Sequence, residues 1–445
     1  MFPKILIANR GEIAVRVIRA CKEMGISTVA VFSEADRNAL HVSLADESIC
    51  IGPAPVAKSY LNMTAILSAA VACGANAIHP GYGLLSENEH FARLCEKCNI
   101  KFIGPSADVI AAMGDKDNAR RTMRSAGVPV IPGCDLVPDA ATAMQEAEKI
   151  GFPLLIKARA GGGGRGIRRV YSLEEVAPAF EAASAEARAA FGDGEVYMEK
   201  LLTHVHHVEV QLLCDAHGHV LCLGERECSI QRRNQKLIEE SPSPVVSPEL
   251  REKLYDAARK AAIAAKYEGV GTIEFLLTQD GQFYFMEMNT RLQVEHPVTE
   301  MVTRFDLVKW QIRVAAGMPV PFDQKEVSIS GHAIECRINA ENPALDFRPS
   351  CGRVELLHVP GGPWVRFDTA LYQDYEIPPF YDSLIGKLIV HAHTRAEAIR
   401  KMQAALCEMV VEGVDHTGDL QLDLISSPAF VAGNYTTSFF DEEKF

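Results

Sequence analysis

Short β-rich segments alternate with helical segments along the first part of the chain, and this alternation limits the fold more than any other feature. The segments are, in order, KILIA (4–8), an amphipathic run after Gly11, TVAVF (28–32), a helical run at 60–73, NAIH (76–79), a helical run at 87–98 and KFIG (101–104). A strand, a crossover helix and a parallel strand form a βαβ unit. The pattern therefore predicts an open, mostly parallel sheet in a first domain at 1–113.

The rest of the chain is long enough for two further domains. At roughly 150 residues per domain, 445 residues suggest about three domains. A charged helix that stops near Gly127 opens a second region, which we place at 114–330 with a compact, strand-rich lid subdomain at about 131–202. GHAIECRIN opens a third region, which we place at 331–445 and expect to be mixed α/β.

Composition excludes several classes of protein. With 45 basic and 58 acidic side chains, the net charge of −13 has the wrong sign for neutralising nucleic-acid phosphates. The 12 cysteines include one CxxC pair, Cys95 and Cys98, but no second CxxC or His pair at zinc spacing, which favours reduced thiols. The N-terminus lacks the apolar core of a signal peptide, and the uncharged stretch 59–86 is too polar to span a bilayer. We therefore expect a cytoplasmic protein that binds neither nucleic acid nor membrane.

The segment TIEFLLTQDGQFYFMEMN predicts a hairpin that carries a metal site. Asp280-Gly281 between two β-rich runs is typical of a two-residue turn. That register places Glu274 opposite Glu287, which is unfavourable unless a cation lies between the two carboxylates. Asn289 lies on the same face by the period of two. Carboxylates and an amide oxygen suit Mg²⁺ or Mn²⁺, and a merely solvated hairpin face is the alternative.

Polar residues continue beyond this hairpin. If the backbone stays extended, Arg291, Gln293 and Glu295 share the metal-binding face. A guanidinium and an amide can hold a small planar anion, and a neighbouring carboxylate can accept its proton. A structural ion pair between Arg291 and Glu295 is the alternative.

A glycine run follows the strand PLLIKA. GGGGRG (161–166) lets backbone N–H groups approach a polyphosphate, although its spacing matches neither a P-loop nor a dinucleotide fingerprint. Lys157 just upstream and Lys116 at the start of the second region can supply positive charge for such a ligand.

Several motifs together resemble those of the biotin carboxylase family. They are IANRGEIA (7–14), HPGYG (79–83), MGDK (113–116), IKA with GGGGRG, YMEK (197–200), QRRNQK (231–236), EMNTRLQVEHPVTE (287–300) and ECRINAE (335–341). The resemblance covers nearly the whole chain. It implies an α/β fold of the ATP-grasp type with a Rossmann-like N-terminal domain. It also implies ATP- and bicarbonate-dependent carboxylation of biotin through carboxyphosphate, with ATP, Mg²⁺ or Mn²⁺, and carrier-bound biotin.

The resemblance also assigns roles to residues. The ATP-binding set is Lys116, Lys157, Gly163, Gly164, Glu199, Lys200, Leu202, His207, Gln231, Asn234, Glu274 and Glu287, and the metal ligands are Glu274, Glu287 and Asn289. The bicarbonate contacts are Lys236, Arg291, Gln293, Val294 and Glu295, with Glu295 as the general base. Arg337 would stabilise the biotin enolate, and Tyr82 would lie near biotin. The catalytic set is thus Arg291, Glu295, Arg337 and Lys236.

The resemblance leads to expectations about the assembly. Since no AMKM-like biotinylation sequence occurs, a separate biotin carboxyl carrier protein and carboxyltransferase subunits are the expected partners. Acetyl-CoA carboxylase in fatty-acid synthesis is the first assignment, with pyruvate or another acyl-CoA as alternative acceptors. A homodimer is expected, although GGPWVRF (361–367) departs from the family's dimer segment, as Asn234 departs from a common histidine. The competing functions are another ATP-grasp ligase that joins a carboxylate to an amine, and a non-enzymatic ATP-binding subunit.

Overall fold

The N-terminal part of the chain forms a five-stranded parallel sheet. The computed structural model describes residues 1–159 and 166–442. The strand order is β3-β2-β1-β4-β5, and all four pairings are parallel. The strands are β1 (Lys4–Ile7), β2 (Ser27–Ser33), β3 (Glu47–Gly52), β4 (Ala77–His79) and β5 (Lys101–Phe102). The open parallel sheet predicted from the alternating segments is therefore confirmed.

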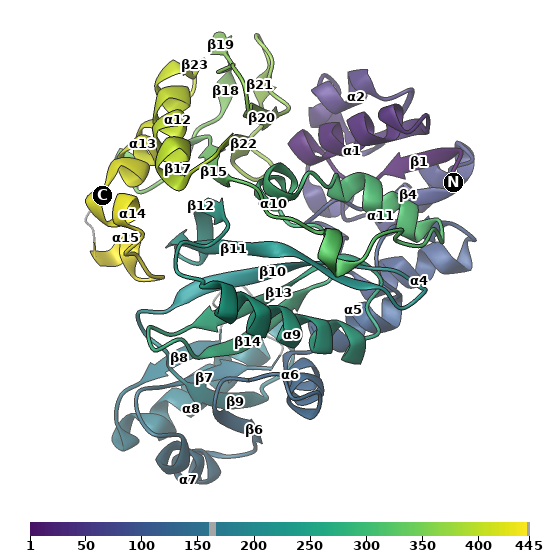
Figure 1. The fold of residues 1–445 in the computed structure, drawn as a ribbon. Coiled ribbons are helices and arrows are strands. Elements are labelled where there is room, and N and C mark those ends of the chain that lie inside the picture. Colours follow the sequence, from purple (N-terminus) through teal and green to yellow (C-terminus); the bar gives the residue numbers. More distant parts are fainter. Residues whose placement is uncertain (160–165, 443–445) are drawn as a thin grey trace.

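Helices link these strands and cover the sheet (Figure 1). They are α1 (Gly11–Glu23), α2 (Leu40–Leu44), α3 (Met63–Ala72), α4 (Glu89–Lys97) and α5 (Ala107–Gly114). Ile5 and Ile7 pack in one hydrophobic cluster and Leu6 in another, because successive strand residues point to opposite faces. Both faces of the sheet are thus buried, as is usual for parallel sheets.

A smaller antiparallel sheet lies at one end of the molecule, away from the chain termini (Figure 1). Its order is β6-β9-β7-β8. The strands are β6 (Gly133–Val137), β7 (Leu154–Ala158), β8 (Ile167–Val170) and β9 (Val196–Lys200), and the helices are α7 (Ala140–Ile150) and α8 (Leu173–Phe191). Helix α6 (Lys116–Ser125) precedes this sheet. Asp115 caps the helix by accepting a hydrogen bond from the Asn118 N–H.

An eight-stranded antiparallel sheet forms the centre of the molecule (Figure 1). Its order is β14-β13-β10-β11-β12-β15-β22-β20. The strands are β10 (His206–Cys214), β11 (Val220–Arg232), β12 (Gln235–Ser241), β13 (Gly269–Leu277), β14 (Phe283–Asn289), β15 (His332–Asn339), β20 (Val365–Thr369) and β22 (Leu384–Ala392). The pairing of β12 with β15 makes one continuous sheet from the central and C-terminal segments. Side chains from both segments can therefore share one site.

Helices flank this sheet and the C-terminal end. They are α9 (Pro248–Ala264), α10 (His296–Thr303), α11 (Leu307–Ala315), α12 (Arg395–Glu408), α13 (Gly418–Ser426), α14 (Pro428–Ala432) and α15 (Phe439–Glu442). Short strands complete the C-terminal part: β16 (Glu341–Asn342), β17 (Arg348–Pro349), β18 (Gly352–Arg353), β19 (Leu356–His358), β21 (Glu376–Ile377) and β23 (Val410–Glu412). Helices α10 and α11 are separate, since Arg304 adopts a φ of 64° and Asp306 caps α11.

The turn between β13 and β14 differs from the predicted two-residue turn. The Thr278 N–H donates to the Gln282 carbonyl at 2.8 Å, so three residues form the loop, with Gly281 at a φ of 82°. A β-bulge at Met286 then shifts the register by one residue. The two departures cancel, and Glu274 still pairs with Glu287.

Within the described residues, no helix is both long and apolar enough to cross a bilayer. All 12 cysteines are free thiols, as expected from their spacing.

Candidate active site

Four charged residues form a row across the central sheet. The strand registers pair Glu287 with Glu274, Glu274 with Glu209, and Glu209 with Arg226. Arg226 is fully buried and binds the Glu209 carboxylate. Three adjacent carboxylates with one guanidinium at the end of the row leave negative charge that further cations must balance.

Lys236 on β12 supplies the next cation. Its ammonium lies 2.7 Å from Glu209, 3.0 Å from Glu274 and 2.6 Å from Glu295. Burial opposes its charge, but these three carboxylates outweigh that effect and hold the pKa of Lys236 well above its ordinary value. Lys236 is therefore a permanent positive charge at the centre of the site.

Glu295 lies between two cations. Besides Lys236, it accepts a hydrogen bond from Arg337 at 3.0 Å, and Arg337 also binds Glu239. Burial opposes ionisation of Glu295, but Lys236 together with Arg337 lowers its pKa to about 2. For Glu239, burial dominates and raises the pKa to about 7 despite the Arg337 contact. Two neighbouring carboxyl groups thus differ strongly in proton affinity.

The backbone that carries Arg291, Gln293 and Glu295 is not extended, contrary to the prediction. Strand β14 ends at Asn289, and Glu295 is the residue that precedes α10. The side chains still converge: the Gln293 amide donates to Glu274 at 2.8 Å, and Arg291 donates to the Asn289 side-chain oxygen at 3.0 Å. The alternative ion pair between Arg291 and Glu295 is absent among the described contacts, since Arg291 pairs with Glu87 at 2.9 Å.

The three predicted metal ligands lie together. Glu287 faces Glu274, and the Asn289 amide donates to Glu274 at 2.8 Å. Burial, and then the Glu274 charge, raise the pKa of Glu287, while the Lys116 charge opposes that rise. A divalent cation between the two carboxylates would relieve this repulsion, so the residues fit Mg²⁺.

A second cluster with potential metal ligands consists of His207, Glu209 and Glu274. The Lys236 ammonium already contacts both carboxylates of that cluster. A metal there would have to displace this cation, which favours the Glu274, Glu287 and Asn289 set instead.

Residues predicted to bind ATP lie on both the small sheet and the central sheet. Lys157 on β7 forms an ion pair with Glu199 on β9, and Lys200 donates to the Phe152 carbonyl at 2.7 Å. His207 lies 2.9 Å from Glu274. Gln231 contacts the His207 ring at 2.8 Å and is thereby connected to the carboxylate row.

The remaining predicted residues vary in how the structure places them. Lys116 begins α6, and Leu202 is half-buried in the loop after β9. Asn234 is exposed in the β11–β12 turn with a φ of 64°. Gly163 and Gly164 lie outside the described residues.

Tyr82 lies at the N-terminal side of the site. Its hydroxyl donates to Glu12 on α1, and its ring faces Lys387 at 5.8 Å. These contacts orient Tyr82 through the N-terminal and C-terminal segments together.

Sequence reasoning missed four charged residues of this site: Glu209, Arg226, Glu239 and Glu87. Single charged residues inside otherwise apolar β-runs, such as Glu209 in HVEVQLL, were the available signal. A lone buried charge needs a partner, but the pattern alone does not tell which strand supplies it.

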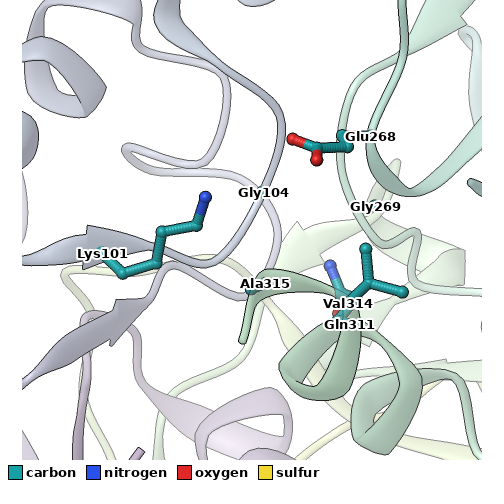
Figure 2. Close-up of a pocket in the computed structure, with 7 residues that line it drawn as sticks. All are labelled: Lys101, Gly104, Glu268, Gly269, Gln311, Val314 and Ala315. Carbon is teal, nitrogen blue, oxygen red and sulfur yellow. The ribbon is translucent and has the colours of Figure 1, made fainter. Parts of the chain in front are cut away.

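Figure 2 shows a separate hollow between the N-terminal region and α11, where Lys101 and Glu268 project from opposite walls. It encloses about 10 Å³, room for about one water molecule. This hollow is too small for a nucleotide.

Comparisons with known proteins agree along the whole chain. Three family models match: "Biotin carboxylase, N-terminal domain" at residues 1–110, "Carbamoyl-phosphate synthase L chain, ATP binding domain" at 115–322 and "Biotin carboxylase C-terminal domain" at 335–442. A biotin carboxylase from Nostoc sp. is 56% identical over 442 residues, which cover 99% of each chain.

Solved structures agree in the same way. The biotin carboxylase from Campylobacter jejuni, a complex with β,γ-ATP, superposes with a TM-score of 0.96 at 48% identity and 99% coverage of both chains. The biotin carboxylase domain dimer of Hydrogenobacter thermophilus 2-oxoglutarate carboxylase, with MgADP and bicarbonate, gives a TM-score of 0.94 at 49% identity, covering 99% of this chain and 98% of that one.

The fold and the carboxylate row therefore define an ATP-grasp enzyme, a class that uses ATP to activate an acid. Within that class the chain belongs to the biotin carboxylase family. Its reaction is the carboxylation of biotin with ATP and bicarbonate, and it uses ATP, Mg²⁺ and biotin.

Proposed function

We propose that the cluster around Lys236 carries out the chemical steps of biotin carboxylation on a carrier-bound biotin. The observation that carries this proposal is the Glu295 carboxylate held between Lys236 and Arg337 beside the facing pair Glu274 and Glu287. Bicarbonate attacks the γ-phosphorus of ATP, ADP leaves, and the resulting carboxyphosphate breaks down to CO₂ and phosphate. The biotin ureido nitrogen then gives its proton to the released phosphate and bonds to CO₂.

In this proposal, Glu295 removes the bicarbonate proton. With a pKa of about 2, Glu295 is a weak base as long as no substrate anion lies beside Lys236 and Arg337. A bicarbonate ion bound beside these cations and Arg291 would share their charge. The proton affinity of Glu295 then rises when the substrate is present.

The nucleotide and the metal would occupy the other side of the carboxylate row. Glu274, Glu287 and Asn289 would hold Mg²⁺, which when bound neutralises charge on the transferred phosphoryl group. The lysines Lys116 and Lys157, with Gly163 and Gly164, would bind the phosphates. Glu199, Lys200, Leu202, His207, Gln231 and Asn234 would contact the rest of the nucleotide.

Biotin would enter from the side of Arg337 and Tyr82. The Arg337 guanidinium is oriented by Glu239 and Glu295, so it can stabilise negative charge on the ureido oxygen after deprotonation.

The proposed domain division is 1–113, 114–330 with a lid subdomain at about 131–202, and 331–445.

The proposed setting is a cytoplasmic, homodimeric subunit that acts with a biotin carboxyl carrier protein and a carboxyltransferase. Acetyl-CoA is the proposed acceptor. Transfer of labelled carbon from bicarbonate to a biotinylated carrier, followed by addition of transferase with acetyl-CoA or pyruvate, tests this setting. Label appearing only with pyruvate would overturn the acceptor assignment.

The first test of the reaction is ADP release by the purified protein. Mg²⁺ and ATP are supplied, and bicarbonate and free biotin are omitted in turn. Release that requires both substrates supports the proposal. Release that is indifferent to both would favour a different ATP-grasp ligase, in which other acids accept the phosphoryl group.

A further inference from the structure

Lys387 on β22 is fully buried and makes a contact that the proposed mechanism does not use. Its ammonium donates to the backbone carbonyl of Val294 at 2.8 Å. Val294 lies between Gln293 and Glu295, in the segment that the proposed mechanism places against bicarbonate. A charged donor to a carbonyl in this setting makes a strong hydrogen bond, because little solvent competes for either group.

His296 makes a matching contact one residue earlier in the segment. Its Nδ1 lies 2.8 Å from the Gln293 carbonyl oxygen. A carbonyl only accepts, so Nδ1 carries the hydrogen. Burial, followed by the charge of Lys387, lowers the pKa of His296 well below its ordinary value, which keeps the ring neutral. The consecutive carbonyls of Gln293 and Val294 therefore each accept a hydrogen bond from a buried side chain.

Fixing these carbonyls fixes the amide groups of the same peptide planes. In a trans peptide the C=O of Gln293 and the N–H of Val294 point in opposite directions. His296 thus sets the direction of the Val294 N–H. Lys387 holds the next peptide plane, which contains the Val294 carbonyl and the Glu295 N–H. Within residues 1–159 and 166–442, no group accepts a hydrogen bond from this N–H. It is available to an anion in the site.

Lys387 is itself held by the N-terminal domain. The Glu12 carboxylate lies 3.2 Å from its ammonium and also accepts a hydrogen bond from the Tyr82 hydroxyl. Asp368 pairs with Lys387 in the strand register and adds a second negative charge nearby. This chain of contacts runs from Tyr82 through Glu12 and Lys387 to Val294. It connects the N-terminal and C-terminal regions of the chain to the segment proposed to bind bicarbonate.

We infer that Lys387 and His296 are positioning residues that hold the two peptide planes on either side of Val294, so that the Val294 N–H is presented to bicarbonate. The inference rests on the proposed contact between Val294 and bicarbonate. Neither side chain is placed against substrate, so their effect on the reaction is transmitted through the two peptide planes. Loss of Lys387 should weaken bicarbonate binding and leave ATP binding in place.

The test is the bicarbonate dependence of ADP release by Lys387→Met. Methionine is unbranched and of similar length but has no donor. The KM for bicarbonate should rise about tenfold, the effect of one misaligned hydrogen bond. The KM for ATP should stay within about twofold of wild type, because the nucleotide residues do not contact Lys387.

A second variant separates loss of the Val294 contact from misfolding caused by an unpaired buried charge. Lys387→Met leaves the buried Glu12 carboxylate without its cation, whereas the double variant with Glu12→Gln removes both charges. The double variant should show the same rise in the KM for bicarbonate. Glu12→Gln alone keeps the donor to Val294 and should stay within about threefold of wild type. An equal rise in Glu12→Gln would overturn the inference, because the ion pair rather than the Val294 contact would then matter.

Arg395→Met is the matched control. Arg395 binds the buried Glu240 and donates to the carbonyls of Phe430 and Val431, away from the site. It should lower stability without changing the KM for bicarbonate. A similar KM rise in this control would show general loosening and overturn the inference. An unchanged KM in Lys387→Met, with a wild type that needs bicarbonate, would overturn the inference alone. A wild type indifferent to bicarbonate would overturn the proposed function with it.

Discussion

Replacing Glu295 with glutamine separates its proposed role as a base from its structural role. Glutamine has nearly the same shape, but it cannot take up a proton. Lys236 and Arg337 donate to different oxygens of Glu295, at 2.6 Å and 3.0 Å, so the single amide oxygen of glutamine keeps one of these two hydrogen bonds. Loss of a general base typically lowers turnover about 10²–10⁴-fold, or about 3–5 kcal/mol in the barrier. We expect bicarbonate-dependent ADP release to fall by at least the lower factor.

The fold should tolerate this substitution. Lys236 keeps Glu209 and Glu274 as partners, and Arg337 keeps Glu239. No buried cation is left unpaired, so the loss in unfolding free energy should be smaller than the roughly 3–5 kcal/mol that a broken buried pair costs. Nucleotide affinity, measured by direct titration, should stay near the wild-type value.

The assay is ADP release at saturating ATP and Mg²⁺ with bicarbonate varied. Glu225→Gln is the control, since Glu225 is equally buried in the central sheet but pairs with Arg251 outside the site. That control should keep full turnover. Turnover of Glu295→Gln within about threefold of wild type would refute the base assignment.

Three further perturbations test other parts of the structure. Glu287→Lys should abolish Mg²⁺-dependent ATP hydrolysis, and a normal rate that still depends on Mg²⁺ would contradict the proposed metal site. Arg226→Met removes one of the two cations that contact the Glu209 carboxylate and should lower the unfolding free energy in urea by roughly 3–5 kcal/mol, whereas a loss under about 1 kcal/mol would show that Lys236 alone balances Glu209. Burial opposes the charge of Glu240, but hydrogen bonds from His332 and Arg395 lower its pKa from 4.5 to about 2. Its carboxylate therefore adds stability above about pH 4.5 that is lost as pH falls toward 2, and wild type should lose stability more steeply than Glu240→Gln between about pH 5 and pH 3; equal slopes in urea titrations would count against this.

The sequence pattern of the hairpin predicts the pairing of Glu274 with Glu287 correctly, although it misses details of the loop and the register. The alternation in TIEFLL and FYFMEMN, with Gly281 between the two runs, was enough to predict a hairpin. It did not reveal the three-residue loop or the bulge at Met286, because loop length and bulges depend on how the strands pack against their neighbours. Glu274 and Glu287 face each other since the two departures compensate.

The segment after the hairpin shows a similar limit. Period-two reasoning placed Arg291, Gln293 and Glu295 on one face, yet the strand ends at Asn289. The Gln293 and Glu295 side chains reach the buried charges of Glu274 and Lys236, which lie next to each other, and Arg291 reaches the neighbouring Asn289. The convergence follows from electrostatics in a low-dielectric interior rather than from backbone periodicity.

The sequence by itself determined the parallel N-terminal sheet, the hairpin and the motifs of the biotin carboxylase family, since these depend on neighbouring residues and on short-range periodicity. Only the tertiary structure decided that Lys236 meets carboxylates from three segments, and that Lys387 is buried beneath Val294. An isolated charged residue in a strand carries no information about its partner. The partner is fixed by strand order and register across distant parts of the chain, where each buried charge must be neutralised.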